Sequence, residues 1–394
     1  MAGAVIENIL YFSDRYSNGL YQLNLDNNEY MFIDYFLDEG YGEWLYFQAY
    51  VWEKKIYFIP GLAENIACFD TILKEISYIK LPQEGRVIRG VNGLYAEKFC
   101  CQKHENVLWM MPVGYNLFLK FDLSNEQLFK IDLPECIKFI EGIFNWRTSF
   151  LYRNELIFQP WAGTIQLHYD IITGYFKLEK FKENIRTYRT CLKNEDFEIY
   201  VPLEIKNGLL IKNRIDKKKK KILFDRNIID NSVINYTCDV PILIENRLYI
   251  IPQFGKHIII LFLPDFYVEY INLNKEFNKD YLFWRGSSVV EDNYKYYIFS
   301  AEIPEILEID KENGHIGLIK LKQESDGLKD KRIRRCLENL NRKAFQVMQK
   351  RILNEGKNEL EDLILLAMCY LKYERIEDYY YGKIIYENLK RSLK

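Results

Sequence analysis

At three comparable points of this sequence an aromatic residue directly precedes an arginine: Trp146-Arg147, Tyr188-Arg189 and Trp284-Arg285. Lys98 adds a fourth cation at a related point of the chain. A guanidinium binds carboxylate or phosphate through paired hydrogen bonds, and Trp and Tyr faces stack on sugars and other rings. Repeated around one axis, such pairs would form a cationic ring suited to an anionic ligand. The candidate ligand-binding residues are therefore Lys98, Trp146, Arg147, Tyr188, Arg189, Trp284 and Arg285.

A second interpretation of the same cations is structural. Each arginine could pair with a nearby acid such as Glu97, Glu141 or Asp239. Pairing of each cation with one of these acids would leave no net positive site for a ligand. The sequence alone keeps both interpretations open.

Other motifs do not indicate a metal ion, a cofactor or a catalytic residue. The chain has no glycine-rich phosphate loop, no H-E-x-x-H, no paired C-x-x-C and no G-x-S-x-G. Cys100, Cys101 and His104 look at first like metal ligands, but a zinc site needs a matching second pair. Cys100 aligns instead with Ser149 and Cys191 at a small-residue position of the repeat described next. We therefore expect the cysteines to be small buried residues, and no metal or cofactor.

A repeat organises the first 320 residues. An aromatic and aliphatic run that ends in Pro is followed, about five residues later, by a second apolar run that often ends in Asp. The prolines at positions 60, 112, 160, 202 and 252 are 52, 48, 42 and 50 residues apart, which is the period of propeller blades. Two divergent copies, at residues 9–25 and 296–310, bring the number of copies to seven.

Each copy predicts four antiparallel strands, because an alternating segment and a turn flank the two runs on both sides. We predict an all-β fold, a seven-bladed β-propeller over residues 1–324, with six or eight blades as alternatives. The first strand of each blade lines the central channel of a propeller. This places Lys98, Arg147 and Arg189 around the channel, two residues ahead of the small-residue position.

The repeat resembles that of the Kelch family. Ile56-Tyr57-Phe58 is similar to the aliphatic-Tyr run of a Kelch blade, and Tyr169-Asp170 to its Tyr-Asp step. Pro stands in place of the Kelch Gly pair in five copies, and the following Trp is missing. The resemblance covers residues 3–322 and implies a propeller. Kelch-like propellers include binding modules and a few enzymes, so the resemblance is compatible with either class of function.

From residue 325 the pattern changes to that of helices. Apolar residues recur at three- and four-residue spacing between Ile333 and Val347, and Gly356 stands where a helix would end. Residues 325–394 hold 16 Lys and Arg against 11 Asp and Glu, so the segment is basic and the propeller acidic. We predict an α-helical C-terminal segment packed on the propeller. Docking of a partner protein and contact with a membrane surface are the alternatives.

The charge and composition of the chain argue against some classes of partner. The 394 residues carry a net charge of −2, which argues against a dedicated nucleic-acid binder. No apolar run is long enough for a membrane helix, and the first residues lack the basic start of a signal peptide. We expect a cytoplasmic protein with no nucleic-acid partner and no integral membrane segment. A surface-associated structural repeat is disfavoured on the same grounds.

Two functions fit these features. The first is a non-catalytic binding or scaffold protein whose propeller face and helical tail contact a protein partner or an anionic sugar or carboxylate ligand. The second is a carbohydrate- or carboxylate-active enzyme of the epimerase or lyase type, with its site at the channel mouth. In the enzyme the cations would bind the substrate, and Glu97 or Glu141 would act as the base.

Overall fold

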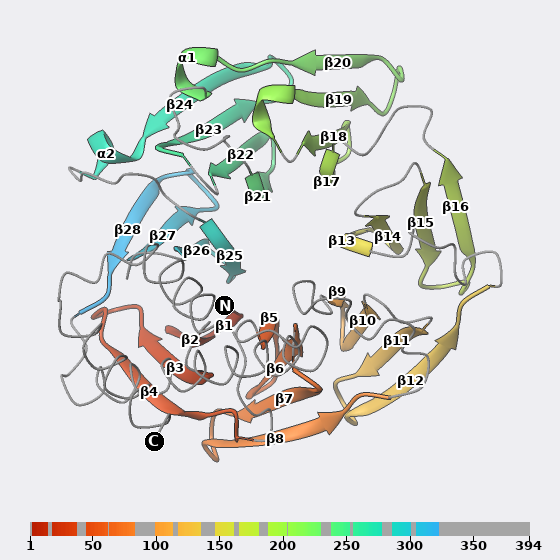
Figure 1. Ribbon diagram of the computed structural model, residues 1–394, viewed down its shortest axis with the longest axis vertical. Coiled ribbons are helices and arrows are strands. Elements are labelled where there is room, and N and C mark those ends of the chain that lie inside the picture. Colours follow the sequence, from red (N-terminus) through yellow and green to blue (C-terminus); the bar gives the residue numbers. More distant parts are fainter. Residues whose placement is uncertain are drawn as a thin grey trace, which may run out of the picture.

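Seven four-stranded antiparallel sheets stand around a central axis in the computed structural model, and each is built from one contiguous stretch of chain (Figure 1). The predicted seven-bladed propeller is therefore confirmed. The structure describes residues 2–14, 18–37, 45–61, 63–82, 99–112, 117–134, 146–160, 165–180, 188–202, 204–229, 238–252, 255–277, 286–300 and 305–322. The predicted helical segment 325–394 and its boundary lie outside these residues.

Each blade runs from an inner strand next to the axis to an outer strand at the rim (Figure 1). Blades 1 and 2 consist of β1 (Gly3–Ile6), β2 (Ile9–Ser13), β3 (Gly19–Asn24), β4 (Tyr30–Tyr35), and β5 (Tyr46–Trp52), β6 (Lys55–Pro60), β7 (Asn65–Asp70), β8 (Glu75–Lys80). Blades 3 and 4 consist of β9 (Phe99–His104), β10 (Val107–Pro112), β11 (Leu117–Asp122), β12 (Gln127–Asp132), and β13 (Trp146–Tyr152), β14 (Glu155–Pro160), β15 (Ile165–Asp170), β16 (Phe176–Lys180).

The remaining blades follow the same plan. Blade 5 consists of β17 (Tyr188–Lys193), β18 (Phe197–Pro202), β19 (Leu209–Asn213) and β20 (Lys219–Ile222). Blades 6 and 7 consist of β21 (Cys238–Ile244), β22 (Arg247–Pro252), β23 (His257–Phe262), β24 (Tyr267–Asn272), and β25 (Gly286–Glu291), β26 (Lys295–Ser300), β27 (Glu305–Asp310), β28 (Ile316–Lys320). The short helices are η3 (Ile205–Asn207), α1 (Arg226–Ile229) and α2 (Leu273–Glu276), and no helix in the described part of the chain is long and apolar enough to cross a membrane.

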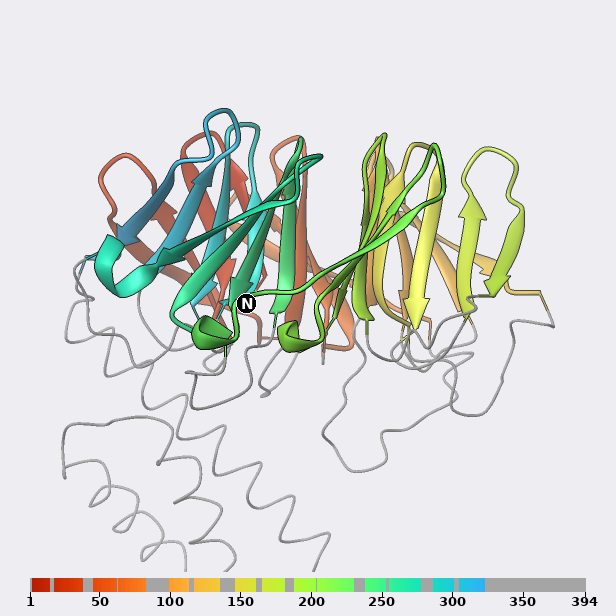
Figure 2. The same cartoon turned by 90° about the horizontal axis from the view of Figure 1, so that it is seen from above.

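The two ends of the ring differ. Seen from the side in Figure 2, one end carries the hairpin turns within the blades, and we call it the turn end. The opposite end, where each inner strand begins, we call the loop end. The five repeated prolines close the second strands β6, β10, β14, β18 and β22 at the loop end. A Pro at the end of a strand leaves no gap in the hydrogen-bonded ladder, which explains why the repeat tolerates it.

The repeated aspartate is a turn residue. Asp170, the last residue of β15, accepts hydrogen bonds at Oδ1 from the backbone N–H groups of Ile172 (3.0 Å) and Thr173 (2.8 Å). These bonds favour the charged carboxylate and lower the pKa of Asp170. Asn213 makes the same pair of bonds in blade 5. The Asp or Asn therefore recurs in the repeat because its side chain accepts the hydrogen bonds of the turn. It needs no catalytic explanation.

Replacing Asp170 by Ala should lower the midpoint of urea unfolding, because two backbone N–H groups in the turn lose their acceptor. Replacing it by Asn should leave the midpoint nearly unchanged at neutral pH, since Asn213 performs the same task with an amide oxygen. The comparison of the two unfolding curves checks the assignment. Equal loss in both variants would mean that the negative charge, rather than the turn geometry, matters.

Apolar clusters pack neighbouring blades against each other at six interfaces in the described part of the ring. They join blades 1 and 2, 2 and 3, 3 and 4, 5 and 6, 6 and 7, and 7 and 1. The last of these closes the ring, with Phe12 and Phe299 rings 5.4 Å apart. No strand is exchanged between the first and last blades. The ring is thus closed by side-chain packing and by an ion pair of Lys322 with Glu29 at 3.0 Å.

Candidate functional site

Four of the predicted ligand-binding residues lie at the start of two neighbouring inner strands. Trp146 and Arg147 begin β13, and Tyr188 and Arg189 begin β17. In both strands the pairing with the second strand of the blade skips the arginine. Each arginine is therefore the extra residue of a β-bulge, a feature that often redirects a side chain near a site. The two arginines hold equivalent places in adjacent blades at the loop end.

Lys98 does not share the position of Arg147 and Arg189. Cys101, and not Cys100 as predicted, occupies the small-residue position of blade 3, because the pairing of β9 with β10 begins without a bulge. Lys98 therefore precedes that position by three residues, whereas the two arginines precede it by two. The missing bulge displaced the alignment made from sequence by one residue.

Trp284 and Arg285 also differ in register from the other aromatic and arginine pairs. Gly286, the first residue of β25, is the residue that aligns with Trp146. Lys98, Trp284 and Arg285 lie outside the described residues, and for the four residues in β13 and β17 the structure places the backbone. The cationic ring stays a prediction.

The interface between blades 4 and 5 differs from the other six, because no apolar cluster joins the two blades among the residues that the structure describes. Successive residues of a strand face opposite sides of the sheet, and the apolar residues of both blades point to their other neighbours. The residues on the opposite faces of these two sheets point to the interface of blades 4 and 5, which we call the polar seam. It includes Glu155, Ile157, Gln166, His168 and Glu179 of blade 4, and Cys191, Lys193, Glu198, Tyr200 and Lys212 of blade 5.

The interface of blades 2 and 3 shows what has changed at the seam. Both interfaces have the same strand register, so their residues can be matched one by one. In each matched pair, the residue from blade 2 or 3 is apolar and lies in the cluster that joins those two blades. The matched residues are Ile66 and Gln166, Cys68 and His168, Leu108 and Glu198, and Phe121 and Lys212.

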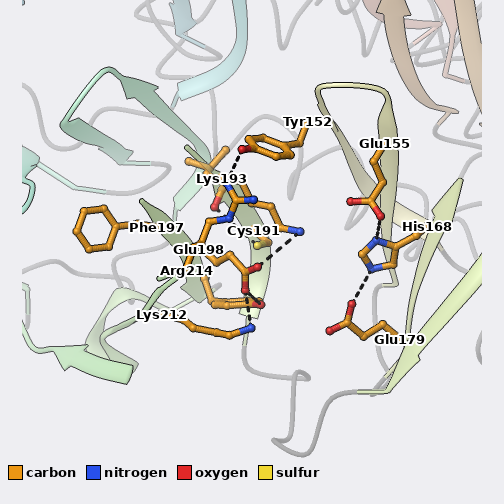
Figure 3. A network of polar contacts seen from close by, with 12 residues as sticks. Tyr152, Glu155, His168, Glu179, Cys191, Lys193, Phe197, Glu198, Lys212 and Arg214 are labelled. Carbon is orange, nitrogen blue, oxygen red and sulfur yellow. Dashed lines mark hydrogen bonds and ion pairs between the residues drawn. The ribbon is translucent and has the colours of Figure 1, made fainter. Parts of the chain in front are cut away.

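On blade 4, His168 is held between two glutamates (Figure 3). The imidazole is 3% exposed, and its Nδ1 lies 2.9 Å from Glu155 Oε1. Because an ionised carboxylate only accepts hydrogen bonds, Nδ1 carries the proton and donates a hydrogen bond to Glu155. This bond lowers the pKa of Glu155. His168 Nε2 lies 3.4 Å from Glu179 Oε2 without the geometry of a hydrogen bond, and the buried Gln166 Nε2 has no partner.

On blade 5, Glu198 gathers three partners (Figure 3). Its carboxylate lies 2.9 Å from Lys212 Nζ and 3.8 Å from Lys193 Nζ, and the Tyr200 hydroxyl donates to it over 3.2 Å. Burial acts to raise the pKa of Glu198, but the bond from Lys212 and the charges of both lysines outweigh it, so this pKa is lowered. Glu198 is therefore a paired anion at neutral pH.

Contacts between the two blades include a group at the turn end. Arg214 of blade 5 donates to the Tyr152 hydroxyl and lies 4.3 Å from the centre of that ring. Arg153 of blade 4 lies 2.9 Å from Glu195 of blade 5. We call these four residues the turn clasp. Closer to the axis, Lys193 lies over the Phe150 ring at 5.6 Å.

The seam can bind and orient polar groups, and the pKa shifts of Glu155, Glu198 and Cys191 disfavour their use as a general acid or a nucleophile. A general acid needs a raised carboxyl pKa, whereas those of Glu155 and Glu198 are lowered. Burial raises the pKa of the Cys191 thiol to about 12, so it stays protonated. No group of three or more His, Cys, Asp or Glu among the described residues could hold a metal ion.

His168, Glu155, Glu198 and Lys212 are not among the candidate site residues predicted from sequence. His168 is buried, but it belongs to a polar network rather than to an apolar cluster. The four described free cysteines, Cys68, Cys100, Cys101 and Cys191, are buried as predicted. Comparing the repeat copies position by position would have revealed the polar residues, since other copies have Ile, Cys, Leu or Phe there.

Comparisons with known proteins identify the fold. No family model and no curated protein matches the sequence. Virginiamycin B lyase from Staphylococcus aureus superposes with a TM-score of 0.55 at 12% identity, over 76% of this chain and 90% of the lyase. A streptogramin B lyase gives 0.50 at 12% identity, over 80% and 86% of the two chains. The dihydro-heme d1 dehydrogenase NirN gives 0.50 at 9% identity, over 80% and 64%.

At such identities the likeness shows the fold alone. Two of these solved propellers are lyases and one is a dehydrogenase, so the shared architecture carries different chemistries. Function must be argued from the residues of this chain.

Proposed function

We propose that this protein is a non-catalytic binding protein whose propeller binds an anionic ligand, a carboxylate or a sugar acid, at the loop end of blades 4 and 5. The observation that carries the proposal is the equivalence of Arg147 and Arg189. Both stand at the β-bulge of neighbouring inner strands, each after an aromatic residue. Two guanidiniums at matched places of adjacent blades suit one anion between them.

The described ionisable residues favour binding over catalysis. Every described carboxylate with a resolved pKa shift is shifted downward, as for Glu126 beside Lys55 and for Glu198 beside Lys212. Such groups are stable anions rather than proton donors at neutral pH. The lyase chemistry of the structural neighbours is not needed to account for any of them.

Two further parts of the proposal rest on sequence. The basic segment 325–394 contacts a protein partner, and the protein acts in the cytoplasm. The Kelch-like character of the repeat, seen in Ile56-Tyr57-Phe58 and Tyr169-Asp170, belongs to the proposal in the same way.

The test is a thermal-shift titration of the full chain with sulfate, phosphate and glucuronate. A ligand at about a hundred times its Kd adds about 2.7 kcal/mol to the stability of the folded state, which raises the melting temperature. The double variant Arg147→Ala with Arg189→Ala should lose this rise. The control, Lys54→Ala with Lys218→Ala, removes two exposed cations at the turn end and should keep it.

Each outcome decides the proposal. An equal rise in wild type and in the Arg147 and Arg189 variant would overturn the site, and so would the absence of any rise with all three anions. An NMR spectrum of glucuronate incubated with the protein should stay unchanged. New product signals would replace the binding function by the enzymatic one.

A further inference from the structure

We propose that the polar seam is the interface at which the ring opens: blades 4 and 5 separate reversibly while the apolar interfaces stay closed. Opening would give access to the inner strands β13 and β17 from between the blades. This inference rests on the packing of the seam and does not require that an anion bind at Arg147 and Arg189.

The first argument compares what separation costs at the two kinds of interface. Parting two apolar faces exposes carbon to water at about 25 cal/mol for every Å². At the seam, the main charged groups keep their partners when the blades part. His168 and Glu155 both belong to blade 4, and Glu198 and Lys212 both belong to blade 5. These pairs are not broken by opening, so the main penalty is the exposure of the apolar seam residues, Ile157 and Tyr200 with the half-buried Phe150 and Leu210.

The second argument is that the closed seam leaves polar atoms unsatisfied. Gln166 is 1% exposed and His168 is 3% exposed, and the Nε2 atom of each has no hydrogen-bond partner. A buried polar atom without a partner costs about 1–3 kcal/mol, and water supplies the partner once the blades separate. These two atoms therefore favour the open state, whereas the matched Ile66 and Cys68 favour the closed state of their own interface.

The third argument concerns what holds the seam together. The charge of Lys193 on blade 5 acts across it to lower the pKa of Glu155 on blade 4. The turn clasp joins the blades at one end through Arg214, Tyr152, Arg153 and Glu195. Attraction between charges weakens with salt. The seam should therefore open more often at high ionic strength.

The native cysteines report this opening directly. Cys191 faces the seam, while Cys68 and Cys101 lie in the cluster between blades 2 and 3 and Cys100 in that between blades 3 and 4. Burial raises the pKa of Cys191 to about 12 and that of Cys68 to about 11. Cys191 is thus no more ionised than Cys68, and faster reaction of Cys191 would reflect access rather than intrinsic reactivity.

The experiment labels the folded full chain with N-ethylmaleimide and follows each cysteine by peptide mass spectrometry. We expect Cys191 to react at least about ten times faster than Cys68, Cys100 and Cys101, which corresponds to about 1.4 kcal/mol less cost of exposure. In about 1 M sodium chloride, where the screening length is about 3 Å, the rate at Cys191 should rise further. Equal rates at the four cysteines, or no effect of salt on Cys191, would overturn the proposal.

Two variants test whether the polar residues and the turn clasp control the opening of the seam. Gln166→Ile with His168→Ile introduces the residues that Ile258 and Ile260 provide in blade 6, and it should slow the labelling of Cys191 about tenfold. Arg214→Gln, which releases the turn clasp, should speed it. An unchanged Cys191 rate in both folded variants would show that the seam is not what opens. If the isoleucine variant fails to fold, the labelling rates of the cysteines in the wild type and in Arg214→Gln still decide whether the seam opens.

Discussion

Replacing Phe118 by Ala should lower the free energy of unfolding by about 4 kcal/mol. Phe118 is fully buried between blades 3 and 4. Its ring centre lies 4.8 Å from that of Tyr169, 5.6 Å from that of Phe158 and 5.7 Å from that of Trp109. The substitution removes these contacts and leaves a cavity in an interface that strands on both sides hold in place.

Urea unfolding followed by tryptophan fluorescence measures this loss, because Trp109 lies within the same cluster. The control is Phe129→Ala on the outer strand of the same blade, where the side chain is 44% exposed. We expect that variant to stay within about 0.5 kcal/mol of the wild type. A loss below about 1 kcal/mol for Phe118→Ala would mean that blade packing contributes much less to stability than the buried ring implies.

We expect the replacement of Glu198 by Leu at the polar seam to lower the free energy of unfolding by about 2 kcal/mol. Removal of one partner from a buried ion pair costs about 3–5 kcal/mol, and the partial exposure of Lys212 reduces this figure. The variant leaves Lys193 and Lys212 close together without their shared anion. Adding Lys212→Phe should recover most of the loss, because blade 3 pairs Leu108 with Phe121 at the same positions.

The pH dependence of stability provides a second measurement for Glu198. Its pKa is lowered in the folded state, so its pairing contributes stability above the unfolded value of about 4.3. That contribution is lost as the pH falls through the lowered native pKa. Glu198→Gln should therefore be less stable than wild type at neutral pH, and the difference should shrink in acid. A difference that stays constant down to the acid transition would contradict the assignment.

The fold could be predicted from sequence because the propeller repeats its own rules. A Pro that closes the second strand recurs every 42 to 52 residues, often with an Asp that accepts turn hydrogen bonds, and each has a local cause that the sequence displays. Five copies with this Pro and two divergent copies sufficed to predict the blade number and the four-stranded sheets. The blade boundaries follow from the same local signals.

The candidate site could be predicted less well, because its residues meet through register rather than through local sequence. A bulge at Arg147 and Arg189, absent from β9, shifts the alignment of Lys98 by one residue and has no sequence signature of its own. The polar seam depends on two faces that belong to different blades. His168 and Glu198 are 30 positions apart and each looks like an ordinary polar residue in an alternating strand.

The contiguity of the blades has a consequence for how the protein is made. Since no sheet borrows a strand from a distant part of the chain, each blade can complete its hydrogen bonding as soon as its own residues leave the ribosome. Blade 1 then waits with its face toward blade 7 uncovered until the last strands arrive. During that interval Phe12 and Tyr21 form an aromatic surface without its partner blade, and such uncovered apolar surface is prone to aggregation until the ring closes.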